Sequence, residues 1–149
     1  MHKVSEVMSR DVRHVAPAER LRRAAQMMRE LDVGALPVCD GEQLVGMVTD
    51  RDIVVRGTAA GLGPDDACVA DVMSEGVRWC FEDQTVEEAM RQMADSQVRR
   101  IPVVSDERQR QLVGMVALGD LAMRPDEPVA DSPAAQVLQE VSAPPRSQP

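Results

Sequence analysis

In this chain of 149 residues, the segment LVGMVTDRD at residues 44–52 returns as LVGMVALGD at residues 112–120. The tripeptide VMS at 7–9 also returns, at 72–74. A period of about 65 residues is too long for a solenoid repeat and too short for a self-sufficient domain. The sequence therefore predicts two copies of one unit that fold together, and we expect the functional site at the seam between the copies.

The two copies share one predicted order of elements. A turn of helix leads into a brief strand, then an amphipathic helix with apolar residues at helical spacing, then two apolar strands and a final helix. This order predicts an α/β unit of the β-α-β-β-α type. The predicted elements lie at 4–8, 13–15, 21–31, 35–39, 44–49 and from 50 in the first copy, and at 69–73, 78–80, 86–93, 100–105, 112–117 and from 118 in the second.

These motifs, in this order and repeated, resemble the CBS domain pair, or Bateman module. The resemblance is carried by the two VMS segments, by ALPV at 35–38 with RIPV at 100–103, and by the two closing stretches. It implies tandem β-α-β-β-α repeats packed sheet to sheet as one pseudo-two-fold module. It points to the stand-alone bacterial CBS-pair proteins of the hypoxic-response type. The family forms dimers through its helices, so we expect a homodimer, with apolar faces around Met27 and Met93 as candidates for the contact.

The domain limits follow from the repeats. We expect repeat 1 at 4–56, a Gly-rich linker at 57–68, repeat 2 at 69–123 and a Pro-rich, flexible tail at 124–149. The net charge of −8 argues against nucleic acid as a partner. No apolar run reaches the roughly 20 residues of a membrane span, so we expect no membrane partner and a cytoplasmic location.

In that compartment the three cysteines are expected to be thiols. Cys39 and Cys80 lie in apolar strand patterns and are predicted core residues, whereas Cys68 lies in the polar linker and is predicted to be the more reactive thiol.

Thr49 and Asp52 are the sharpest candidate site, because a hydroxyl and a carboxylate lie three residues apart where a strand turns into a helix. A carboxylate can accept two hydrogen bonds from the diol of a ribose, and a helix start favours a phosphate. The same pair can instead cap the helix, with Thr49 as N-cap and Asp52 at the third helical position. In the CBS family this position binds adenosine ligands, so the resemblance implies AMP, ADP or ATP, with S-adenosylmethionine less favoured.

Arg99 and Arg100 precede the second apolar strand pair and have Gly34-Ala35 as their counterparts in the first copy. The resemblance implies that a basic residue here contacts the phosphates of a ligand held by the other copy; the alternative is two solvated arginines at a strand start. Asp120 is the counterpart of Asp52, but Ala117 replaces the threonine, so we expect one competent site rather than two.

The chain shows no catalytic motif and no zinc-type spacing of His and Cys, so we predict no enzyme, no metal site and no tightly bound cofactor. The predicted function is a regulatory sensor that signals through self-association or an effector protein in trans. Two alternatives stay open: a ligand-free interaction or structural module, and a redox sensor that works through its thiols.

Overall fold

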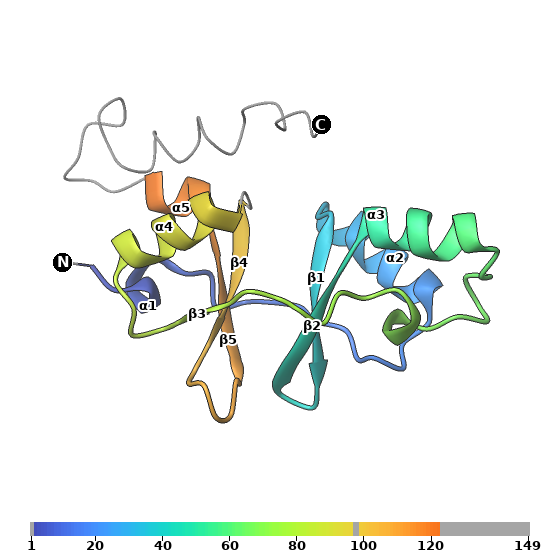
Figure 1. The fold of residues 1–149 in the computed structure, drawn as a ribbon, viewed down its shortest axis with the longest axis horizontal. Helices are drawn as coiled ribbons and strands as arrows, with labels where there is room; N and C mark the ends of the chain where they lie inside the picture. The colour runs from blue at the N-terminus through green and yellow to red at the C-terminus, as the bar shows by residue number, and fades with distance from the viewer. Residues whose placement is uncertain (1, 97–98, 123–149) are drawn as a thin grey trace, which may run out of the picture. The chain divides into compact units, whose positions relative to one another are not determined.

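The computed structural model describes residues 2–96 and 99–122 and confirms the predicted α/β class (Figure 1). Strands form two small sheets, one with the order β1-β2 and the other with the order β3-β4-β5. The elements are α1 (Val4–Val7), α2 (Leu21–Leu31), β1 (Ala35–Asp40), β2 (Gln43–Thr49), α3 (Asp50–Asp52), the π-helical turn η1 (Ile53–Gly57), the 3-10 turns η2 (Thr58–Ala60) and η3 (Val69–Asp71), β3 (Cys80–Phe81), α4 (Val86–Ser96), β4 (Arg100–Val104), β5 (Leu112–Ala117) and α5 (Leu118–Ala122).

The chain divides into two compact units that do not follow the two sequence repeats. Unit 1 contains the residues up to Asp11, the segment Trp79–Glu107 and the described residues from Val113 onward. Unit 2 contains Val12–Arg78 and Arg108–Leu112. The N-terminal segment of the first copy is thus in unit 1, together with the strands of the second copy. Residues 69–78 of the second copy are in unit 2, together with the strands of the first copy. The compact units are therefore units of packing, and the repeats expected at 4–56 and 69–123 are units of sequence.

The VMS segments explain the exchange. In unit 2, Ser74 and Met47 exchange two backbone hydrogen bonds, Met47 N to Ser74 O at 3.0 Å and Ser74 N to Met47 O at 2.9 Å. In unit 1, Ser9 and Met115 do the same at 2.8 and 2.9 Å. Each VMS segment therefore pairs with the closing strand of the other copy.

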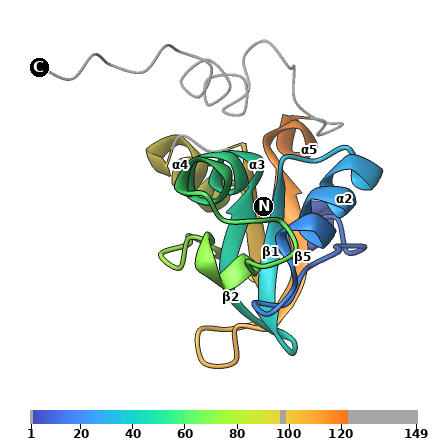
Figure 2. The ribbon, with the colours of Figure 1, turned by 90° about the vertical axis from the view of Figure 1, so that its right-hand side faces the viewer.

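Unit 2 is built on the antiparallel pair β1 and β2, in which Ala35 lies opposite Thr49. Helix α2 lies along β1 and packs its apolar face on the sheet (Figure 1; Figure 2). Helical spacing places the apolar residues of α2 on one side of the helix, and their burial against the sheet stabilises the unit. The buried core residues include Leu21, Ala24, Met28, Leu36, Val38 and Val48.

The segment predicted as a linker is bound to the start of α2. No side chain caps this helix, and its first N–H groups instead donate to the linker, Leu21 N to Ala67 O at 3.2 Å and Arg22 N to Pro64 O at 3.0 Å. Arg22 also forms a two-bond pair with Asp65, with N–O distances of 2.6 and 2.7 Å. The first half of repeat 1 and the linker are therefore one structural piece.

Unit 1 packs the short helix α1 and the helices α4 and α5 on the sheet of β3, β4 and β5. Strand β3 runs parallel to β4, with Cys80 opposite Val103. The hydrophobic core of the unit includes Val4, Val86, Met93, Ile101, Val116 and Leu118.

Most predicted elements are confirmed. The differences lie in the short segments and in the helix predicted from residue 50, which is the three-residue α3 followed by the π-helical turn η1 and the 3-10 turn η2. The segment 13–15 forms only an isolated parallel bridge between Val15 and Val38, and the predicted helix at 69–73 is the single 3-10 turn η3. The strand predicted at 78–80 begins at Cys80. Segments this short carry little periodic signal, so their neighbours in space decide their geometry. The tail predicted at 124–149 lies outside the described residues.

Candidate ligand-binding site

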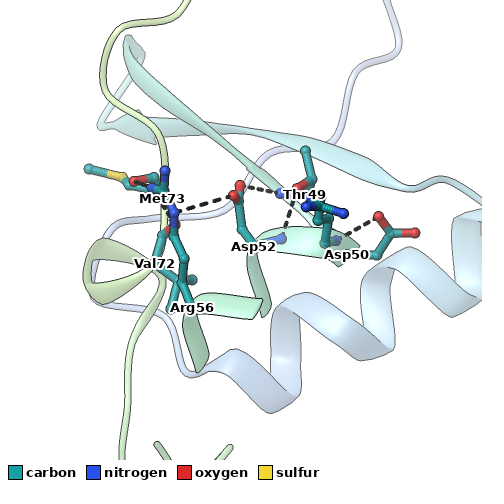
Figure 3. Close-up of polar contacts among 7 residues, drawn as sticks. Thr49, Asp50, Asp52, Arg56, Val72 and Met73 are labelled. Carbon is teal, nitrogen blue, oxygen red and sulfur yellow. Dashed lines mark hydrogen bonds and ion pairs between the residues drawn. The ribbon is translucent and has the colours of Figure 1, made fainter. Parts of the chain in front are cut away.

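The turn from β2 into α3 holds Thr49 and Asp52 together in a closed pair of hydrogen bonds. Thr49 Oγ1 accepts from the backbone N of Asp52 at 3.0 Å, and Asp52 Oδ2 accepts from the backbone N of Thr49 at 3.0 Å (Figure 3). Thr49 has extended backbone angles and is the N-cap of the helix, so the arrangement is a capping box. The capping geometry foreseen from the sequence is therefore present.

Arg56 lies next to the Asp52 carboxylate. Its Nε lies 3.9 Å from Asp52 Oδ1, four residues earlier in the chain. Its Nη1 donates to the carbonyl oxygens of Val72 and Met73, each at 3.4 Å. Figure 3 shows the guanidinium between the Asp52 carboxylate and the backbone of the second VMS segment. The Asp52 side chain is only 14% exposed, whereas that of Arg56 is 56% exposed.

Sequence reasoning did not single out Arg56. The available signal was the spacing of four residues from Asp52, which places two side chains on the same helical face. The contacts with Val72 and Met73 had no such signal, because they come from a separate segment of the chain.

The remaining predicted site residues belong to unit 1. Arg99 and Arg100 are exposed at the start of β4, and the carbonyl of Arg99 accepts from Leu118 N at 2.8 Å. Asp120 lies in α5, but its side chain is outside what the structure describes. Ala117 ends β5 and offers no hydroxyl at the position of Thr49. The structure thus brings Thr49 and Asp52 together in unit 2, and the arginine pair and Asp120 stay predictions.

All three cysteines are free, and their burial follows the sequence prediction. Cys39 and Cys80 are buried, and burial raises the pKa of Cys39 to about 11 and that of Cys80 to about 12. Cys68 is half-buried at the N-cap of η3, where its Sγ lies 3.5 Å from Asp71 Oδ2. The accessible thiol of the three is therefore Cys68.

Two further predictions concern metals and membranes. Within residues 2–96 and 99–122, no three His, Cys, Asp or Glu side chains gather in a group that could hold a metal ion. Over the same part of the chain, every helix is too short or too polar to cross a bilayer.

Comparison with known proteins places the repeats in a family. The model of the CBS domain matches residues 4–56 and 69–127. Hypoxic response protein 1 of Mycobacterium tuberculosis is 42% identical over 118 residues, which cover 78% of this chain and 80% of that protein.

Two solved structures show the same fold. The crystal structure of Hypoxic Response Protein I, which contains two coordinated zinc ions, superposes with a TM-score of 0.73 at 41% identity and covers 82% of this chain and 98% of that one. The crystal structure of CBSX2 in complex with AMP superposes with a TM-score of 0.70 at 24% identity and covers 81% and 93%.

Proposed function

Since this chain belongs to the CBS domain family and is a tandem CBS-domain pair, we propose that it is a non-catalytic sensor whose ligand is AMP, ADP or ATP. In this proposal the Asp52 carboxylate binds the ribose diol of the ligand. The observation that carries the proposal is the geometry of the Thr49–Asp52 turn, in which a carboxylate with 14% exposure is held in a fixed orientation where a strand enters a helix.

The capping box leaves capacity for a ligand. An ionised carboxylate offers about four acceptor positions, and the backbone N of Thr49 occupies one of them, on Oδ2. The other oxygen faces Arg56 at 3.9 Å, which is longer than a hydrogen bond. Two ribose hydroxyls can therefore donate to Asp52 while Thr49 continues to cap the helix. Capping and ligand binding are compatible at this turn.

Two considerations favour an adenosine ligand. The resemblance to the CBS family assigns ribose binding to this turn. CBSX2, which has the same fold, was crystallised with AMP. At 24% identity that likeness concerns the fold, so the ligand of this chain rests on its own residues. Phosphate contacts from Arg99 or Arg100, and a silent second site at Asp120, stay part of the proposal.

Calorimetric titration with AMP, ATP, adenosine and S-adenosylmethionine tests the proposal. Asp52→Ala should abolish measurable binding, because it removes two charge-assisted hydrogen bonds, a loss of roughly 2–4 kcal/mol. Asp120→Ala is the matched control and should bind like the wild type. Arg100→Ala should weaken AMP and ATP much more than adenosine. Equal losses from the two aspartate variants would refute the asymmetric site, and a wild type that binds none of the four compounds would favour a ligand-free interaction module.

Signalling requires a surface that a partner can contact. Met27 and Met93 cannot supply it, because both are buried in the cores of their own units, at 5% and 0% exposure. Val54 and Val55 on η1 are exposed at 58% and 49%, and they replace the methionines in the proposed homodimer contact. Light scattering after gel filtration should show a dimer that Val54→Asp dissociates; a monomeric wild type would leave an effector in trans as the proposed route.

A further inference from the structure

Arg56 is placed to give the Asp52 site a positive charge. Nη1 of its guanidinium is held by two neutral carbonyl oxygens, those of Val72 and Met73, while Nε faces the Asp52 carboxylate at 3.9 Å. The neutral contacts fix the position of the group without cancelling its charge. Because the side chain is 56% exposed, the rest of its donor fork remains accessible from solvent.

The turn needs such a cation if its ligand carries a phosphate. Asp50 and Asp52 place two carboxylates within the first turn of α3, and Arg51 between them is an exposed, solvated side chain. A nucleotide whose ribose diol is held by Asp52 carries its phosphate on the other side of the sugar ring, and like charges separated by about one sugar ring in a partly buried site still repel. A guanidinium beside Asp52 offsets the repulsion, and its planar fork matches phosphate oxygens.

We propose that Arg56 makes the Asp52 site prefer a phosphorylated nucleoside over the free nucleoside. This inference rests on the proposed function, since it assigns charge selectivity to the same site. It adds Arg56 as a cation in unit 2, four residues from Asp52 in the chain. Phosphate binding then does not depend on Arg99 and Arg100 alone. The contacts with Val72 and Met73 have a second role, because they hold the guanidinium in place before the ligand arrives and reduce the entropy lost on binding.

The experiment compares the affinities of AMP and adenosine in four proteins by calorimetry. Arg56→Gln removes the charge and should weaken AMP about tenfold while adenosine changes by less than about twofold. Arg56→Lys keeps the charge but loses the fork, and should retain part of the preference for AMP. Arg51→Gln is the matched control, because it removes an exposed arginine five residues away in the chain and should leave both affinities unchanged.

The ratio of the two affinities separates charge recognition from a structural role. If Arg56→Gln weakens AMP and adenosine by the same factor, Arg56 only positions Asp52 and the second VMS segment, and the inference is wrong. It is also wrong if Arg51→Gln has the same effect, or if Arg100→Ala abolishes the preference for AMP while Arg56→Gln leaves that preference unchanged. Failure of the proposed function looks different, because the wild type would then bind neither AMP nor adenosine.

Discussion

Gly46→Ala tests the exchanged pairing of the VMS segments most directly. A Cβ atom built on Gly46 would lie 2.7 Å from the backbone oxygen of Ser74 and 3.2 Å from Met73 Sδ. The first contact is too close for real atoms, and a backbone oxygen cannot rotate away as a side chain can. The methyl group must therefore push the second VMS segment off strand β2.

The cost follows from the contacts that would be lost. The two hydrogen bonds between Met47 and Ser74 contribute about 1 kcal/mol each, and overpacking costs about 1–3 kcal/mol. Alanine recovers about 0.5–1 kcal/mol of this, because it is less flexible than glycine in the unfolded chain. The net loss is about 2–4 kcal/mol, which corresponds to a fall in Tm of roughly 10 °C.

Differential scanning calorimetry measures the effect, and the chain provides its own controls. Gly76 has no atom within 4 Å of a built Cβ, so Gly76→Ala should melt at or slightly above the wild-type temperature. Gly114→Ala should repeat the large loss, because its Cβ would lie 2.8 Å from Ser9 O. A Gly46→Ala protein that melts within about 2 °C of Gly76→Ala would refute the pairing of Ser74 with β2.

Three other results are expected. Brief alkylation followed by mass spectrometry should label Cys68 before Cys39 or Cys80, and early labelling of Cys39 would contradict its burial. Stability to urea should decrease as the pH rises from about 9 towards 12, by up to about 1.4 kcal/mol per pH unit for each buried thiol. Stability decreases with pH because the pKa values of Cys39 and Cys80 are raised in the folded chain, which keeps protons that the unfolded chain has released. A stability that does not change between about pH 9 and 12 would show that the thiols are solvated. Thr49→Ala should lower the free energy of unfolding by about 1 kcal/mol whereas Thr49→Ser should not, and equal stabilities would mean that the hydroxyl does not cap α3.

The local features of this protein were determined by the sequence alone. The helix Leu21–Leu31 and the strands β2 and β5 were predicted closely, because the spacing of apolar residues reports the period of each element. The Thr49–Asp52 capping box was also predictable, since its partners are three residues apart and the backbone brings them together without help from the rest of the fold. Burial of Cys39 and Cys80 followed from the strands that contain them.

Only the tertiary structure decided which copy each VMS segment joins. A repeat in sequence is equally consistent with pairing inside one copy and pairing across copies, because both satisfy the same hydrogen-bonding groups. The choice of Ser74 with Met47 and Ser9 with Met115 depends on close packing at Gly46 and Gly114, between segments remote in the chain. The contact of Arg56 with the carbonyls of Val72 and Met73 exists for the same reason. It arises when the second VMS segment docks on β2, and no local spacing rule encodes such a contact.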